Sequence, residues 1–382
     1  MKPIARTALI GSIATVVGVL TGTCATAQEE STSVGGYGEI QYVDPEGGVR
    51  GTVDVPRFII FLEHTFNAEV LFVSEIEIEH TKIEGGADGG EVAIEQAYLQ
   101  FRIGEKTDLR AGLVLVPAGI INETHEPPTF LSVRRPLFDR VVVPTTWREI
   151  GVGISGGVPW VEGLQYRAYL TSGLNSDGFS PSNGIRGGRY AGALAPVNNL
   201  ALSGRMEYVD EGIKIGGWVY HGGSSNNNVE LGTGMFDAAV TGYGLDARYT
   251  LGDVSLRGVI AGFAISAADT INAIRLRDTT GPAIGSAIGG GYLEVAYNMM
   301  PMLDQSSGAQ ILPFIRFESL NTQASMPDGF VASKANDRMI VTAGLAVKPT
   351  YNTVVKADWT MNNDGTDANV PGALSVGVGY NF

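Results

Sequence analysis

The chain has 382 residues, a formal net charge of −14 and 52 glycines, a glycine content about twice that of an average globular protein. Charged residues make up only 17% of it and hydrophobic residues 44%, which argues against an intrinsically disordered chain. The acidic balance argues against a nucleic-acid-binding surface, and the absence of a Gly-X-Y period excludes collagen. A glycine-rich, weakly charged chain of this length favours many β-strands over helices.

The first 27 residues have the pattern of a secretory signal peptide. Lys2 and Arg6 precede a short apolar run at 8–20, and a small-residue cleavage motif ends at Ala27. Cys24 is the only cysteine. A lipoprotein would carry its lipid there, but the three residues before Cys24 match a lipobox poorly. We therefore predict domains at 1–27, the signal peptide, and 28–382, an exported chain without disulfides.

Segments of about ten residues with period-two alternation recur along the exported chain. Beyond the leader, no window holds the roughly 18 apolar residues that a spanning helix needs. We predict sixteen strands, at 36–43, 55–66, 68–80, 91–103, 106–116, 148–157, 163–172, 199–209, 213–222, 237–250, 252–265, 289–300, 309–319, 337–349, 352–362 and 372–382. The predicted fold class is all-β, a 16-stranded antiparallel transmembrane β-barrel.

The connections between these segments alternate in length, which is typical of a membrane barrel with short periplasmic turns and long outer loops. The short turns are at 67, 104–105, 210–212 and 349–351, and the long connections are at 117–147, 173–198, 266–288 and 320–336. The longest, 117–147, carries no helix signal and is too long for a simple connector, which favours a functional loop.

The two faces of the strands differ in polarity. In the last strand Leu374, Val376 and Val378 share one face, and Ser375 and Gly377 share the other. In water the polar face would be outside, whereas in a membrane barrel it would line the lumen, and the pattern alone leaves both open. The even strand count and the aromatic end of the chain favour the membrane.

Charged residues that lie opposite apolar strand faces should point inward, because an Arg or Lys facing lipid near mid-membrane costs about 2–4 kcal/mol. The predicted lumen-facing residues are the bases Arg110, Arg167, Arg205, Arg248, Arg316, Arg338 and Lys356, and the acids Glu75, Glu77, Glu79, Glu207, Asp246, Glu294, Glu318 and Asp358. Such charges either set ion preference or pair across strands and brace the wall.

Several stretches carry a family resemblance. The densest are 111–130 (AGLVLVPAGIINETHEPPTF) and 144–153 (PTTWREIGVG), with further likeness at 36–39, 61–80 and 95–101. They resemble the phosphate-selective porin O and P family of Gram-negative outer-membrane porins. The resemblance implies a channel in outer-membrane lipid, often a homotrimer, whose third outer loop folds inward as a constriction. The C-terminal Phe382 resembles the signal that the barrel-assembly machinery reads during insertion.

The loop 117–147 supplies the predicted constriction residues. Glu123, His125 and Glu126 lie on one limb, and Arg134, Arg135 and Arg140 lie on the other. We predict that acids and arginines face each other across the pore, and the alternative is an external loop with solvated charges. His125 beside two acids permits a weak cation site, but no histidine has metal-ligand spacing, so we predict no metal and no cofactor.

Matches to GxGxxG at 151–156 and GxSxG at 153–157 lie inside a predicted strand with no helix after it, so we regard them as chance. No catalytic group stands out, and we predict that the protein is not an enzyme. The predicted function is passive diffusion of small hydrophilic solutes or ions, with anions such as phosphate among the candidates. A structural or adhesive barrel with a closed lumen, and an outer-membrane barrel enzyme, are the alternatives.

Overall fold

The computed structural model describes residues 30–81, 89–226, 228–232, 234, 236–277, 281–366 and 368–382. The predicted signal peptide, with its cleavage site near Ala27, and Cys24 lie outside these residues. Within the described ranges, no helix is both long enough and apolar enough to span a membrane.

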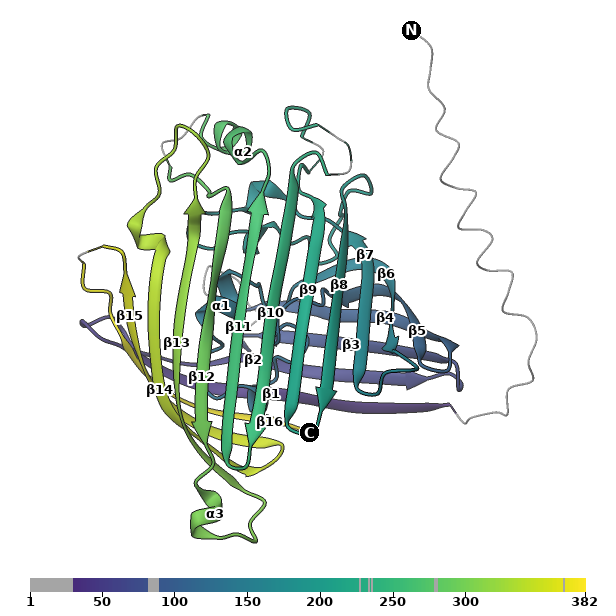
Figure 1. Ribbon diagram of the computed structural model, residues 1–382, viewed down its shortest axis with the longest axis vertical. Coiled ribbons are helices and arrows are strands. Elements are labelled where there is room, and N and C mark those ends of the chain that lie inside the picture. Colours follow the sequence, from purple (N-terminus) through teal and green to yellow (C-terminus); the bar gives the residue numbers. More distant parts are fainter. Residues whose placement is uncertain are drawn as a thin grey trace.

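The described strands form a closed antiparallel barrel, in which β1 pairs with both β2 and β16 (Figure 1). The strands are β1 (Ser31–Pro45), β2 (Thr52–Thr65), β3 (Val70–Glu79), β4 (Val92–Gly104), β5 (Thr107–Leu115), β6 (Arg148–Gly157), β7 (Leu164–Ser172), β8 (Leu200–Asp210), β9 (Ile213–Gly223), β10 (Ala239–Leu251), β11 (Val254–Ile265), β12 (Ala287–Tyr297), β13 (Gln310–Ser325), β14 (Asp337–Thr350), β15 (Thr353–Asp364) and β16 (Ala373–Asn381). The predicted sixteen-stranded barrel is confirmed.

The largest differences from the predicted bounds are at β1 and β13. Strand β1 begins at Ser31 because its first residues pair with the end of β2, as in Ser31 opposite Thr65. Strand β13 continues to Ser325, which pairs with Ala287 of β12 beyond a register shift. The last long connection therefore spans 326–336 rather than 320–336.

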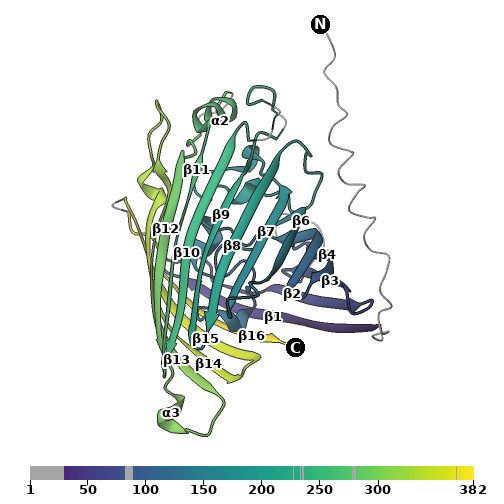
Figure 2. The same ribbon diagram turned by 45° about the vertical axis from the view of Figure 1, so that its right-hand side comes forward.

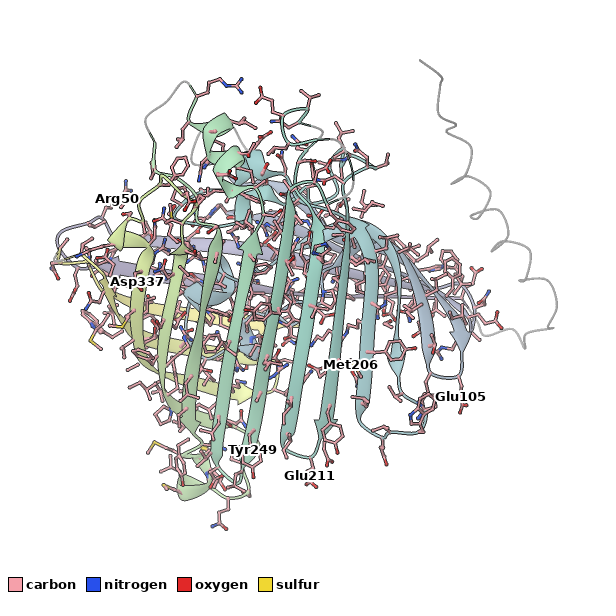
Figure 3. All side chains as sticks on the ribbon, turned by 45° about the horizontal axis from the view of Figure 1, so that its top comes forward. Arg50, Glu105, Met206, Glu211, Tyr249 and Asp337 are labelled. Carbon is pink, nitrogen blue, oxygen red and sulfur yellow. The ribbon has the colours of Figure 1, made fainter. Side chains whose placement is uncertain are left out.

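Long and short connections lie at opposite ends of the barrel (Figure 2). The exception is the connection 298–309, which lies at the short-turn end, although it is long and carries a helix. Figure 3 shows Glu105 and Glu211 at the short turns and Arg50 at the opposite end. The helices are α1 (Leu137–Val141), α2 (Ala268–Arg275) and α3 (Met300–Leu303), with 3-10 turns η2 (Pro127–Thr129), η3 (Ser176–Gly178), η4 (Arg186–Gly188) and η5 (Lys334–Asn336).

Helix α1 corrects the expectation that 117–147 contains no helix. It is a single turn of five residues, too short for a hydrophobic period to appear in the sequence. The backbone N–H of Phe138 donates to the Glu318 carboxylate at 2.9 Å, which satisfies one of the free donors at the helix start. That carboxylate comes from β13 and is remote in the chain.

The polarity of the wall is opposite to that of a water-soluble sheet. On β16, Val376 and Val378 are 40% and 45% exposed. Ser375, which precedes Val376, is 1% exposed. Met206 on β8 likewise projects from the outer wall (Figure 3). Apolar side chains therefore cover the outside and polar ones the inside, which decides the alternative that the sequence left open in favour of a lipid-facing barrel.

An apolar cluster fills part of the interior near the long loops. Trp147 packs on Tyr220 of β9, with ring centroids 4.7 Å apart, and Phe138 of α1 packs on Tyr292 of β12 at 5.7 Å. Phe179 of the 173–199 connection is buried in the same cluster. The loops are therefore packed onto the β9–β12 side of the barrel, where apolar side chains occupy the interior.

Phe382 completes the seam between the first and last strands. Its backbone N–H donates to Gly36 at 2.9 Å, and its carbonyl accepts from the Gly36 N–H at 3.0 Å. Deleting Phe382 removes both bonds and the terminal ring, so the folded, heat-modifiable fraction on a gel should fall. Phe66→Ala, which removes another exposed aromatic ring at the same end, should retain the wild-type fraction. Equal folding of the deletion and the wild type would show that the terminal residue is dispensable.

Candidate pore-constriction site

Asn122 joins the two ends of the connection between β5 and β6. Its Nδ2 donates to the carbonyls of Val116 and Trp147 at 2.7 and 3.0 Å, and its Oδ1 accepts from the Trp147 N–H at 2.7 Å. Asn122 is 1% exposed, so an unpaired amide there would be costly. The clamp closes residues 116–147 into a compact loop, named the β5–β6 loop below.

The β5–β6 loop crosses the barrel interior, because its groups bond to inward side chains of strands far apart around the wall. The contacts are Gln41 of β1 to the Val133 carbonyl (3.2 Å), Arg257 of β11 to the Thr129 carbonyl (2.9 Å), Arg316 of β13 to the Ser132 hydroxyl (2.7 Å), Lys356 of β15 to the Ser132 carbonyl (2.9 Å), and the Val133 N–H to Asp358 of β15 (2.5 Å). Polar and charged side chains of the strands therefore hold the loop, mostly through its backbone groups.

The strand-borne charges predicted to face the lumen all avoid the exposed outer face. Glu75, Glu77, Glu207, Asp246, Glu294, Glu318, Asp358, Arg205, Arg316 and Lys356 are buried, and Glu79, Arg110, Arg167, Arg248 and Arg338 are half-buried. Several of them pair with one another. Arg205 bonds Asp246 and Glu207, each at 2.7 Å, and Arg316 bonds Glu318 at 2.9 Å and Glu294 at 3.0 Å. These two arginines brace the wall.

The acidic limb of the loop lies against β3, β4 and β7. Glu123 pairs with Arg167 of β7 at 3.1 Å. His125 Nε2 lies 3.1 Å from Glu95 of β4 and 3.6 Å from Glu75 of β3. Glu123, His125 and Glu126 line a cavity of about 400 Å³ that extends to Phe382 at the short-turn end, and we name it the inner chamber.

His125 is buried among carboxylates. Burial lowers the pKa of its imidazole, but Glu95 and then Glu75 outweigh that effect and hold the pKa well above its usual range. A positive charge is therefore favoured at this point of the loop. The Tyr37 ring of β1 meets the imidazole edge to face, with centroids 5.9 Å apart.

The basic limb lies at the long-loop end of β13–β15. Arg134, Arg135 and Arg140 line a second cavity of about 320 Å³, which we name the vestibule. Its lining holds five arginines, these three with Arg316 and Arg338, against the three carboxylates Glu318, Asp358 and Asp364. The acidic and basic limbs thus line two separate cavities rather than facing each other across one opening.

Two vestibule arginines lack an ion-pair partner at contact distance. Within the described residues, the side chains of Arg134 and Arg140 make no hydrogen bond and no ion pair, whereas Arg135 donates to the His125 carbonyl at 3.1 Å. Desolvation by the surrounding protein, and then the like charges of Arg134 and Arg186, lower the pKa of Arg140 to about 10. Arg140 thus remains a cation at neutral pH and can attract an anion.

Sequence reasoning did not single out Glu95, Arg148 or Arg257. Glu95 is fully buried beside His125, although the preceding Ile94 is 50% exposed. The alternation of apolar and polar residues along β4 was the signal that could have found Glu95. Because successive side chains of a strand point to opposite faces, an apolar residue that faces lipid places its two neighbours inside. Arg148 ends the loop 3.7 Å from Glu95, and Arg257 holds the Thr129 carbonyl.

A disulfide can test the position of the loop. A Cβ built on Gly377 of β16 would lie 3.0 Å from Cγ1 of Val133, a separation compatible with a bridge. Residues 30–382 contain no cysteine, so Val133→Cys with Gly377→Cys should form one disulfide and change gel mobility under oxidation. Val133→Cys with Val376→Cys is the matched control, because Val376 faces outward. Equal crosslinking of both pairs would contradict the inward placement.

Asp139 of α1 predicts a pH dependence of stability. Burial raises its pKa to about 8, an effect that the Tyr292 hydroxyl opposes and the Glu318 carboxylate reinforces. Because the folded state then holds a proton that the unfolded state releases, this residue makes stability fall as pH rises from about 4 to about 8. The melting temperature of Asp139→Asn should therefore rise above that of the wild type by an amount that grows as the pH increases over that range.

Circular-dichroism melting of both proteins at several pH values measures this difference. The exposed Asp269→Asn of α2 should follow the wild-type dependence. A difference in melting temperature between Asp139→Asn and the wild type that stays constant with pH would contradict the prediction.

Solved structures with this architecture are outer-membrane porins. OmpF of Salmonella typhi, solved with daunomycin, superimposes with a TM-score of 0.63 at 15% identity, covering 92% of this chain and 97% of that one. An anion-selective porin from Comamonas acidovorans gives a TM-score of 0.55 at 12% identity, covering 93% of this chain and all of that one. At such identities the likeness shows the fold, a porin-type barrel.

Sequence comparison places the chain more narrowly. No family model matches it. A protein of Aquifex aeolicus (strain VF5), described as uncharacterized, is 33% identical over 339 residues, which are 87% of this chain and 76% of that protein. The chain belongs to the same family as this Aquifex aeolicus protein.

Proposed function

We propose that the protein is an outer-membrane porin of a Gram-negative bacterium, through which small hydrophilic solutes diffuse passively, with a preference for anions. The observation that carries the preference is the excess of five arginines over three carboxylates in the vestibule, where Arg134 and Arg140 make no ion pair at contact distance with the described residues. The porin-type fold supports the channel. Homotrimeric assembly and insertion by the barrel-assembly machinery are part of the same proposal and rest on the family resemblance.

The acidic net charge of the chain does not determine the charge along this passage. Many acids lie on exposed turns, such as Glu105 and Glu211 at the short-turn end (Figure 3), where salt screens them within about 10 Å at 0.1 M. Inside the wall, Arg205 and Arg316 pair with the four carboxylates of Glu207, Asp246, Glu294 and Glu318. The vestibule arginines remain, and fixed charges in a narrow low-dielectric passage set ion preference. Phosphate is one candidate anion.

Reversal potentials in a planar bilayer under a KCl gradient test the proposal. The wild type should favour chloride, and Arg134→Gln with Arg140→Gln should shift the reversal potential toward potassium, most strongly at low salt. Arg50→Gln, which removes an exposed charge at the same end, should shift it little. A double variant with the wild-type potential would remove these arginines from the selectivity mechanism. A wild type that inserts without conducting would favour the structural barrel with a closed lumen.

A further inference from the structure

Three electron-pair donors converge where the β5–β6 loop meets the wall. One ligand atom each from Glu75, Glu95 and His125 lies within 4.8 Å of the others. His125 Nε2 is 3.1 Å from Glu95 Oε2 and 3.6 Å from Glu75 Oε1. All three residues are buried, at 3%, 0% and 3% exposure. A proton or a metal ion must hold such a group together.

The surrounding bonds orient these atoms as in a metal site. His125 Nδ1 lies 2.9 Å from the Asn122 carbonyl, which can only accept, so Nδ1 carries a hydrogen and Nε2 is the nitrogen that can ligate a metal ion in exchange for its proton. Glu75 is fixed by the Tyr37 hydroxyl at 3.0 Å and by Gln96 at 2.7 Å. Outer-shell donors of this kind are the usual support of ligating carboxylates.

Glu95 supplies a second, independent indication. It is fully buried, yet its Oε1 has no hydrogen-bond partner among the described residues. Arg148 Nη1 is 3.7 Å from that oxygen, too long for a hydrogen bond. Oε1 therefore keeps a lone pair that can accept from a cation.

The spacing fits a small tetrahedral ion. Zn²⁺ binds imidazole nitrogen and carboxylate oxygen at about 2.0–2.2 Å, which places adjacent tetrahedral ligands about 3.3–3.6 Å apart. The separations of 3.1 and 3.6 Å from Nε2 bracket that range. Ca²⁺ and Mg²⁺ need six or more oxygen or water ligands, so this mixed set disfavours them. The inner chamber touches Glu75 and His125 and gives access for the ion and room for a fourth, water ligand.

We propose that Glu75, Glu95 and His125 form a binding site for a divalent transition-metal ion of the Zn²⁺ class, which fastens the β5–β6 loop to β3 and β4. Of the two acids near His125 in the sequence, Glu123 pairs with Arg167, and Glu126 is not among the residues whose ligand atoms converge. The site is independent of the proposed anion preference, because the vestibule arginines lie in a separate cavity.

Calorimetric titration of ZnCl₂ into the full barrel in detergent, carrying no histidine tag, tests the site. The wild type should bind one Zn²⁺ per chain. Glu95→Gln and His125→Gln should weaken that binding at least about tenfold, the size of effect seen on changing metal-site residues. Glu126→Gln, which lines the same chamber, and His80→Gln, which removes an exposed histidine paired with Asp54, should bind as the wild type does.

The visible absorption spectrum of bound Co²⁺ is a second measurement of the site. It reports tetrahedral ligation by nitrogen and oxygen. The wild type should give this spectrum, and Glu95→Gln should lose it while keeping wild-type heat modifiability. If His125→Gln fails to fold, Glu75→Gln takes its place with the same expected loss. Unchanged affinity in Glu95→Gln, loss of binding in His80→Gln, or no Zn²⁺ binding by the folded wild type would each overturn the proposal.

Discussion

A backbone in hydrocarbon must pair every N–H and C=O within the protein, and closure of the barrel is how this chain meets that constraint. The seam between β1 and β16, finished by the Gly36–Phe382 bonds, removes the last free edge. Closure in lipid then fixes the polarity of each face. Side chains such as Val376 are stable outside, and polar ones such as Ser375 must go inside. The strand-borne charges described above are thereby concentrated in the lumen.

The β5–β6 loop changes what those concentrated charges do. Glu318, Asp358 and Lys356 bond to its backbone, and Trp147 fastens it to the apolar side. Groups used in this way hold structure and are not free to attract ions. The charge available to a solute is what remains after this pairing. The vestibule lining holds five arginines against three carboxylates, opposite in sign to the chain as a whole, so net charge is a poor guide to the charge inside the barrel.

The sequence predicts the strands well because each strand carries its own two-residue alternation, independent of its partners. Strand β6 has the predicted bounds, whereas the end of β13 depends on pairing with Ala287 of β12, which no local pattern contains. The site is less predictable for the same reason. The composition of 117–147 singled out His125, but its partners Glu75 and Glu95 come from β3 and β4. The pairing of these two strands, with a register shift at Glu75, brings the two carboxylates together.

The loop is therefore held in two different ways at its two limbs. Toward β13 and β15, several backbone hydrogen bonds distribute the attachment, so no single group decides it. Toward β3 and β4, one imidazole between two carboxylates carries most of it. Two buried carboxylates this close repel each other unless a cation lies between them. The acidic limb, which lines the inner chamber, is thus held by His125 toward β3 and β4 and by the Glu123–Arg167 pair toward β7.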